Sequence, residues 1–187
     1  MAGIIEKVGP CRLTYREADF HSLARSIVFQ QLNGKAAATI FARLAAAAKA
    51  DPLTPEAVLK VRLPKLRAAG LSAQKASYIR DLAARTRSGE LDFARLPALD
   101  DAGVIEHLTQ VKGVGVWTAQ MLLMFALRRK DVLPTADYGI RAAMKRAYEL
   151  PELPKPTEME TIAEAWRPYR SIACWYLWRY LDGPAEM

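Results

Sequence analysis

Apolar residues recur at helical spacing along most of the chain. The first stripe has the spacing i, i+3, i+4, i+7 and i+8 and consists of Phe20, Leu23, Ala24, Ile27 and Val28. We expect this helix to end near Asn33-Gly34, because Asn and Gly commonly follow a helix. The chain shows no convincing alternation of apolar and polar residues, the pattern that would predict a strand.

Similar stripes and stop signals predict the remaining helices. Gly70 is expected to end one short helix, and Ser72 to cap a basic helix that ends at Ser88-Gly89. A proline-rich loop over 151–156 precedes a last helical stretch over about 157–181, which Pro168 would kink or restart. The helix that Gly70 ends and the helix that Ser72 caps cover 64–69 and 73–87, and the other predicted helices cover 37–48, 54–61, 101–110 and 116–127. The pattern therefore predicts an all-α fold, a single compact unit with two lobes over residues 1–187.

Composition narrows the possible partners and cofactors. The chain has 187 residues, 51% of them hydrophobic, and a net charge of +7, which favours nucleic acid first and an acidic membrane surface second. Two cysteines cannot build an iron–sulfur cluster or a four-thiolate metal site, and they suggest a reducing compartment. The most apolar run, 121–127, is too short to cross a bilayer. We therefore expect a cytoplasmic, nucleoid-associated protein without a membrane role.

The most informative segment is 108–119, which reads LTQVKGVGVWTA. A predicted helix enters it, a second helix leaves it, and two glycines separated by one residue allow a tight turn between them. Backbone amides of such a turn, and those that begin the second helix, suit a phosphate group. A plain corner between two helices is the alternative. The predicted phosphate contacts of this hairpin, about 101–128, are Lys112, Gly113, Val114, Gly115 and Thr118.

A carboxylate follows the hairpin in the segment 132–141, which reads VLPTADYGIR. Asp137 stands after a proline-containing loop and at the start of a predicted helix, within a loop and helix over 131–149. Aspartate is a favoured N-cap, so a purely structural role is the alternative, and both roles can hold together. A fixed anion at this place would stabilise a positive charge that develops beside it.

Four segments, in this order, are informative together: 26–37 (SIVFQQLNGKAA), 70–79 (GLSAQKASYI), the hairpin with Asp137, and 166–171 (WRPYRS) with the aromatic helix after it. They resemble the 3-methyladenine DNA glycosylase II family of the helix-hairpin-helix DNA glycosylases. The resemblance runs from about Phe20 to Trp178. It implies a two-lobed fold with the active-site cleft between the lobes, and Asp137 as the catalytic residue.

The resemblance gives individual residues roles. Gln31, with Leu32 beside it, stands where relatives push a side chain into the duplex as the damaged base leaves the stack, and a helix-end glutamine bonded to backbone is the alternative. Trp178 stands at a base-pocket position, where an indole face would attract a cationic alkylated base. Core packing is its alternative. The secondary pocket candidates are Trp117 and Tyr138. Backbone carbonyls that would hold a monovalent cation belong to Thr109, Val111 and Val114.

Departures from related families refine the expected reaction. Trp117 occupies the position of the nucleophilic lysine of bifunctional relatives, so we expect hydrolysis without lyase activity. No cofactor is required, and no iron–sulfur cluster is expected. The chain looks like the compact form of the family, without an N-terminal β-domain. The implied substrate is duplex DNA that contains alkylated bases of the 3-methyladenine and 7-methylguanine type, bound by a monomer.

Two other functions remain open from the sequence. The hairpin also serves as a phosphate clamp in proteins without glycosylase activity, although a clamp needs no carboxylate at Asp137. A glycosylase of the same fold for another lesion or a mismatch is the second alternative. Several basic residues are candidates for phosphate contacts, with a solvated surface as the alternative for each: Lys35, Lys75, Arg80, Lys112 and Arg141.

Overall fold

The computed structural model describes residues 1–182, which are helical and contain no strand. The described chain forms two compact units. Unit 1 consists of Met1–Tyr15 and residues 123–182, and unit 2 consists of Arg16–Leu122. The boundary between Leu122 and Leu123 lies inside α8 (Val116–Phe125). The prediction of an all-α, two-lobed protein is confirmed.

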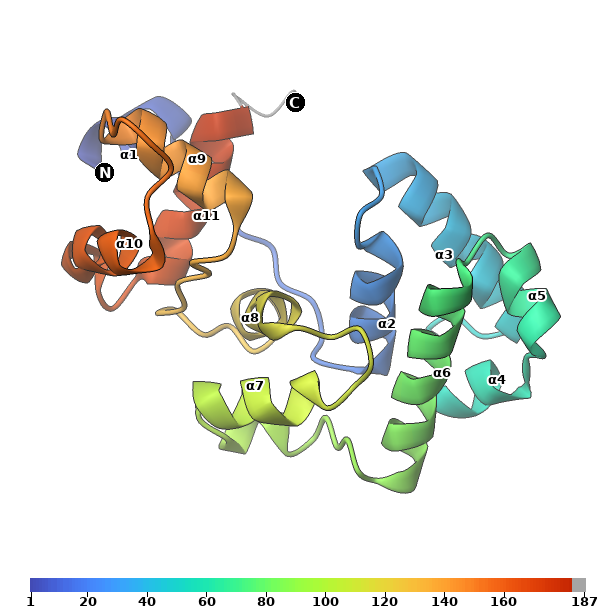
Figure 1. The fold of residues 1–187 in the computed structure, drawn as a ribbon. Coiled ribbons are helices and arrows are strands. Elements are labelled where there is room, and N and C mark those ends of the chain that lie inside the picture. The colour runs from blue at the N-terminus through green and yellow to red at the C-terminus, as the bar shows by residue number, and fades with distance from the viewer. Residues whose placement is uncertain (183–187) are drawn as a thin grey trace. The chain divides into compact units, whose positions relative to one another are not determined.

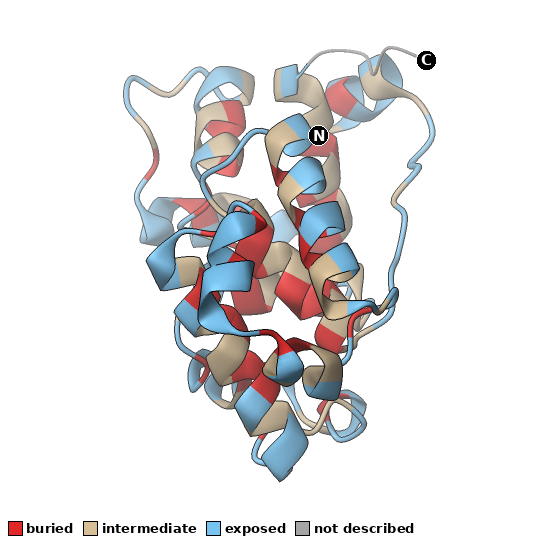
Figure 2. Ribbon diagram, turned by 90° about the vertical axis from the view of Figure 1, so that its right-hand side faces the viewer, coloured by how far each residue is buried: buried red, intermediate tan, exposed pale blue. Residues whose placement is uncertain are grey.

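Unit 2 is built around α6 (Ala73–Ser88), which lies beside α2 (Phe20–Phe29) and α4 (Pro55–Lys60) (Figure 1). Each of these helices buries apolar residues. Figure 2 colours the buried positions of the chain red. Leu23 and Ile27 of α2 and Ile79 of α6 have no exposed surface. The other elements of the unit are α3 (Gly34–Ala48), α5 (Leu63–Ala68), η1 (Leu96–Ala98), α7 (Asp101–Thr109) and the first part of α8.

The predicted end of the first amphipathic helix is wrong. Helix α2 ends at Phe29, and Asn33 caps the next helix, where its side-chain oxygen accepts a hydrogen bond from the amide of Ala36 at 2.8 Å. Asparagine serves helix starts as readily as helix ends, so the Asn-Gly pair was assigned to the wrong helix. The residues between the helices form a short turn in which Gln31 has a φ of 55°.

Other helix limits agree with the sequence prediction because one side chain or one backbone angle sets each of them. The Ser72 hydroxyl caps α6 by accepting a hydrogen bond from the amide of Lys75, and Gly89 ends α6 with a φ of 81°. Gly70 follows the end of α5 with a φ of 104°. Both angles lie in the left-handed region that favours glycine.

Unit 1 is centred on α11 (Arg170–Asp182), which lies beside α9 (Tyr138–Ala147) and α1 (Ala2–Val8) (Figure 1). The last helical stretch divides into α10 (Pro156–Ala163), η2 (Glu164–Trp166) and α11, so the interruption expected at Pro168 is confirmed. Helix α1 was not predicted. It buries only Ile4, so its sequence carries no stripe of apolar positions.

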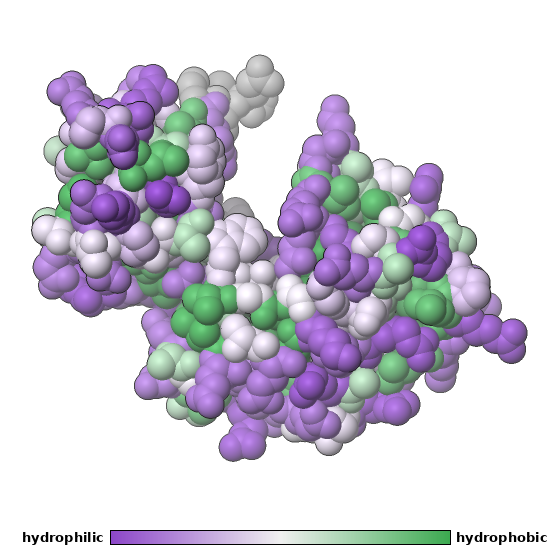
Figure 3. All heavy atoms as spheres, in the orientation of Figure 1, coloured by the Kyte–Doolittle hydropathy of each residue, from purple (hydrophilic) through white to green (hydrophobic). Residues whose placement is uncertain are grey.

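Hydrophilic residues cover much of the surface of each unit in the view of Figure 3. Large apolar side chains that remain exposed include Leu32, Trp117 and Tyr138. Within residues 1–182, no helix has the length and hydropathy needed to cross a membrane.

Candidate active site

Asp137 is the N-cap of α9 and is only 8% exposed. One of its carboxylate oxygens, Oδ1, accepts hydrogen bonds from the amide of Ile140 at 2.8 Å and from the indole Nε1 of Trp178 at 3.0 Å. Its own amide donates to the carbonyl of Pro134 at 3.0 Å, which closes the preceding turn. The carboxylate is therefore held by its own helix, by the loop before it and by α11.

The indole of Trp178 is fixed from more than one side. Its ring stacks on Phe125 with 5.9 Å between centroids, while Nε1 donates to Asp137. A Cβ atom at Gly139 would lie 3.1 Å from Cδ1 of this indole, so glycine allows the close approach of α11 to the first turn of α9. Two of the residues expected in the site, Asp137 and Trp178, are thus in direct contact.

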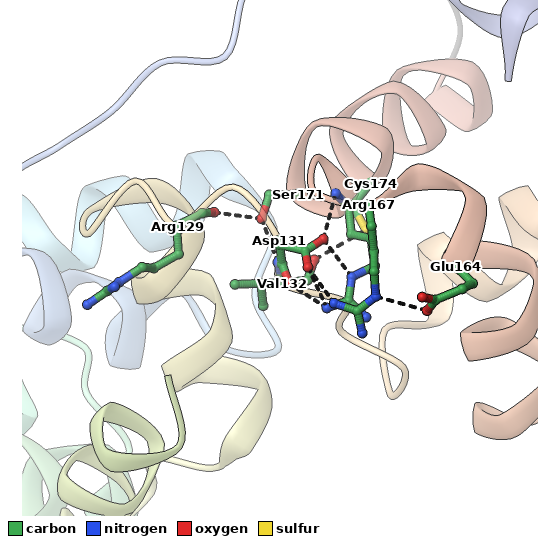
Figure 4. A network of polar contacts seen from close by, with 8 residues as sticks. Arg129, Asp131, Val132, Glu164, Arg167, Ser171 and Cys174 are labelled. Atoms are coloured by element: carbon green, nitrogen blue, oxygen red, sulfur yellow. Dashed lines mark hydrogen bonds and ion pairs between the residues drawn. The ribbon is translucent and has the colours of Figure 1, made fainter. Parts of the chain in front are cut away.

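The loop that leads to Asp137 is attached to the start of α11 by a polar network (Figure 4). The guanidinium of Arg170 donates to both carboxylate oxygens of Asp131, at 2.7 and 2.9 Å, and Arg167 adds a bond of 2.7 Å. The hydroxyl of Ser171 donates to the carbonyl of Arg129 at 2.7 Å and accepts from the amide of Val132 at 3.0 Å. The loop is therefore bonded to α11 near residue 131 and again at Asp137.

Two ionisable groups of this region have shifted pKa values. Burial raises the pKa of Asp131, but its hydrogen bonds to Arg170 and the charges of Arg170 and Arg167 outweigh burial, so the net pKa lies below the usual value. Burial raises the pKa of the Cys174 thiol, and the negative charge of Asp137 raises it further. Cys174 is therefore a neutral thiol at physiological pH and does not compete with Asp137 for a role as an anion.

We expect Asp131→Asn to destabilise the protein by about 2–3 kcal/mol, because it removes the charge from a partly buried bidentate pair. The pKa of Asp131 is lowered in the folded state, so its contribution is complete above the unfolded pKa near 3.9 and is lost as the pH falls through the folded pKa. Denaturant unfolding from pH 7 to pH 3 measures this. The variant should lose less stability than the wild type below about pH 4.

A matched control for this prediction is Glu160→Gln, which removes an exposed carboxylate from α10 of the same unit. We expect its stability to stay within about 0.5 kcal/mol of the wild type. Equal losses in the two variants at pH 7, or parallel acid profiles for Asp131→Asn and the wild type, would show that the Asp131 network does not anchor the loop.

The hairpin of unit 2 uses its two glycines differently. Gly113 has a φ of 79°, and a Cβ atom there would lie 2.1 Å from Cδ2 of Tyr78. At Gly115, a Cβ atom would meet nothing within 4 Å, so this position faces open space. The amide of Lys112 donates to Asp81 at 2.9 Å, and the amide of Val114 donates to the carbonyl of Val111 at 3.0 Å. Among the described residues, the amides of Gly113 and Gly115 have no acceptor, which leaves them able to bind an anion.

The expected wedge residues lie in the turn after α2. Gln31 and Leu32 are both exposed, and Leu32 retains 40% of its surface. The glutamine that is bonded to backbone is its neighbour Gln30, whose Nε2 donates to the carbonyl of Gly113 at 2.9 Å and to the Thr118 hydroxyl at 3.3 Å. Thr118 itself is 4% exposed, so its hydroxyl serves this contact within the protein.

Several other expected site residues can be placed. Tyr138 follows Asp137 and is 70% exposed, whereas Trp117 belongs to unit 2 and is 41% exposed at the start of α8. Of the hairpin carbonyls expected to bind a cation, that of Val111 accepts one hydrogen bond and keeps a second lone pair. The cation at Thr109, Val111 and Val114 stays a prediction. No cluster of three or more His, Cys, Asp or Glu side chains within residues 1–182 is arranged to hold a metal.

Three of the five basic residues considered for phosphate contact bond to carbonyl oxygens of the protein. Lys75 donates to the carbonyls of Val28 and Gln30, Arg80 to that of Val61, and Arg141 to that of Pro154. Lys35 and Lys112 remain exposed. Lys112 lies 3.9 Å from a carboxylate oxygen of Asp81.

Comparison with known proteins places this arrangement in a family. Residues 24–168 match the family described as HhH-GPD superfamily base excision DNA repair protein. The chain belongs to this superfamily. The match covers most of the chain, including the hairpin and Asp137. Together with the relatives and the DNA-bound structure described next, it identifies the protein as a DNA glycosylase of base excision repair, with DNA as its partner.

The relatives and solved structures agree with that assignment. The chain is 35% identical to DNA-3-methyladenine glycosylase 1 of Schizosaccharomyces pombe, over 91% of this chain and 75% of the relative. It is similar to the structure of a 3-methyladenine DNA glycosylase of the same organism in complex with abasic DNA, with 34% identity and a TM-score of 0.82 over 95% of this chain and 89% of the other. A DNA-3-methyladenine glycosidase of Bacillus halodurans gives 38% identity and a TM-score of 0.85 over 96% and 83% of the two chains.

Sequence reasoning did not predict the network around Asp131 or the contacts of Gln30. Both depend on residues far apart in the chain, 39 positions for Asp131 with Arg170 and 83 for Gln30 with Gly113. Arg170 lies in the fourth block of the family resemblance, which was a usable signal for a role. No comparable signal in the sequence marked its partner, the carboxylate of Asp131.

Proposed function

We propose that this glycosylase hydrolyses the N-glycosidic bond to N3- and N7-alkylated purines in duplex DNA, with Asp137 as the catalytic carboxylate. The observation that carries the proposal is the fixed position of this carboxylate, buried at the start of α9 and bonded through Oδ1 to Trp178 and to Ile140. The names of the relatives, which are 3-methyladenine glycosylases, support the choice of lesion.

In the proposed reaction, the bond between the sugar C1′ and the purine nitrogen breaks, and both of its electrons leave with the base. An alkylated purine carries a positive charge, so it departs as a neutral molecule without needing a proton from the protein. The positive charge that develops on the sugar is stabilised by the Asp137 carboxylate. Water then bonds to C1′, and its proton passes to Asp137 or to solvent.

Selection of a cationic base is assigned to aromatic faces. One face of Trp178 is occupied by Phe125, so the opposite face is the one proposed to meet the base. Tyr138, exposed beside Asp137 in the same unit, is proposed as a second pocket residue. Because cation–π attraction depends on charge, this arrangement favours alkylated over normal purines without reading the hydrogen bonds of the base.

The DNA contacts of the proposal lie in unit 2. Gly115 and the amides of the hairpin are assigned to a phosphate, with Lys112 nearby, and Gln31 and Leu32 to the space that the flipped base leaves. Trp117 stands at the position of the lysine of bifunctional relatives, so we expect an intact strand with an abasic site and no lyase product. The protein is proposed to act as a monomer on chromosomal DNA.

The test is to incubate the protein with methylated duplex DNA and to measure the released free bases by chromatography. We expect 3-methyladenine and 7-methylguanine in the supernatant and abasic sites that become strand breaks only after alkali treatment. Strand breaks without alkali would contradict the monofunctional assignment. If DNA binding is normal but neither base is released, the alkylation assignment is wrong, and oxidised, deaminated and mismatched substrates would then separate another glycosylase activity from a phosphate clamp.

A further inference from the structure

We infer that one face of α6 is a brace that holds the wedge turn (residues 30–33) and the hairpin turn (residues 110–115) at a fixed spacing for base flipping. Lys75 is its main positioning residue. The brace consists of three α6 side chains at intervals of three residues: Lys75, Tyr78 and Asp81. The residues that these side chains contact in the two turns all belong to unit 2. The inference rests on the proposed function, because it concerns how the duplex is opened for that reaction.

Lys75 fixes the wedge turn. Its ammonium donates to the carbonyls of Val28 and Gln30, each at 2.6 Å. Both carbonyls lie at the C-terminal end of α2, where backbone acceptors have no partner within the helix and carry the negative end of the helix dipole. Lys75 is therefore committed to the protein backbone, which explains why a lysine of this predicted basic helix is a poor candidate for a phosphate contact.

Tyr78 and Asp81 fix the hairpin turn from the same helix face. The ring of Tyr78 lies against the Cα atom of Gly113 so closely that no side chain fits there. The carboxylate of Asp81 accepts the amide of Lys112 at 2.9 Å. A helical spacing of three residues places neighbouring side chains on one face, so α6 contacts the wedge turn and the hairpin turn one after the other.

Gln30 closes the arrangement by joining the two turns directly. Its backbone carbonyl binds Lys75, while its side-chain amide reaches the carbonyl of Gly113 at 2.9 Å and the hydroxyl of Thr118 at 3.3 Å. The wedge turn, the hairpin turn and α6 are therefore each bonded to the other two. Figure 1 shows α2, α6 and the α7–α8 turn as neighbours.

A fixed spacing matters because the two turns have different tasks on the same DNA. The hairpin is assigned to a phosphate, whereas the wedge must enter the base stack a set distance away. Gln31, at the tip of the wedge turn, has a φ of 55°, a conformation that a non-glycine residue keeps only when its surroundings enforce it. The bonds of Lys75 and Gln30 on either side supply that enforcement, so wedge insertion needs no reordering of the turn.

The experiment compares release of 7-methylguanine from duplex DNA and from single-stranded DNA, measured as kcat/KM for each variant. Single-stranded DNA needs no wedge, since its bases are already unpaired. We expect Lys75→Met to lower the duplex value by roughly 10- to 100-fold and the single-stranded value by less than about 3-fold, given that unstacking costs a few kcal/mol. Lys75→Arg, which keeps donors and charge, should restore most of the duplex value. Lys65→Met, at an exposed lysine of α5, is the control for loss of one positive charge and should change neither value.

A second variant and a second readout keep the test independent of folding and of lesion identity. Gln30→Leu breaks the bonds to the hairpin and leaves those of Tyr78 and Asp81, and it should lower the duplex value selectively as well. Wedge insertion is also read directly from the fluorescence of 2-aminopurine placed next to an abasic-site analogue in duplex DNA, which should rise with the wild type and rise much less with Lys75→Met and Gln30→Leu.

The outcomes separate the brace from the proposed function. Parallel losses on duplex and single-stranded DNA, or no loss in either variant, would overturn the brace. If the wild type releases no alkylated base from either DNA, the proposed function fails, and the 2-aminopurine signal alone decides the brace. A fluorescence rise equal to the wild type in both folded variants would then show that the two turns are not held for wedge insertion.

Discussion

Asp137→Asn should reduce release of alkylated bases from duplex DNA by about 1,000-fold or more, the scale expected when a fixed charge that stabilises the transition state is lost. The substitution is nearly isosteric. Asparagine is as good an N-cap as aspartate, and its side-chain oxygen can still accept the amide of Ile140 and the indole of Trp178. The loss should therefore appear in the rate constant of base release measured under single-turnover conditions. The binding of DNA that contains an abasic-site analogue should change by less than about 3-fold.

The control for this prediction is thermal stability, which should stay within about 1 kcal/mol of the wild type because the cap is kept. Asp100→Asn offers a matched comparison, since Asp100 is also an N-cap, for α7, and accepts the amide of Gly103 at 2.8 Å. It should leave base release unchanged. Activity within about 10-fold of the wild type for Asp137→Asn would mean that Asp137 only caps α9 and that another group stabilises the sugar.

The parts of the fold that the sequence predicted well are those fixed by neighbouring residues. Ser72 and Gly89 delimit α6 through one hydroxyl and one left-handed backbone angle, and both are visible in the sequence. Asn33-Gly34 failed as a signal because the same pair suits the end of one helix and the start of the next, and the capping bond to Ala36 decides for the second. Helix α1 escaped prediction because it depends on packing against α11 and buries a single side chain.

The candidate site divides in the same way. The place of Asp137 at a helix start could be predicted because a local pattern, a proline-containing loop before the helix, marks it. Its catalytic role was inferred from the family resemblance and stays a proposal. Its bond to Trp178 joins residues 41 positions apart, and no local pattern indicates it. For Lys75, the position in a basic helix suggested a contact with DNA phosphate. In the structure, its ammonium instead donates to two backbone carbonyls 45 and 47 positions away. Side-chain partners of long charged residues depend on tertiary packing, which residue type alone does not determine.

Gly113→Ala should destabilise the protein by about 3 kcal/mol and lower Tm by roughly 6–12 °C. Two costs add. The φ of 79° is unfavourable for alanine by about 1–2 kcal/mol, and the new Cβ atom would lie 2.1 Å from the ring of Tyr78, which must move. Differential scanning calorimetry measures the change. In a Tyr78→Ala background the steric cost disappears, so the same substitution should then cost only the 1–2 kcal/mol of the backbone angle.

Gly115→Ala is the matched variant that separates stability from DNA binding at this hairpin. Its Cβ atom would meet no protein atom within 4 Å, so we expect stability within about 0.5 kcal/mol of the wild type. If a phosphate approaches the backbone there, the same methyl group should weaken binding of abasic-site DNA by about 10-fold, the cost of losing one charge-assisted hydrogen bond. Binding equal to the wild type would exclude close phosphate approach at Gly115. A loss of stability as large as that of Gly113→Ala would mean that both glycines serve the fold of the turn and neither the DNA.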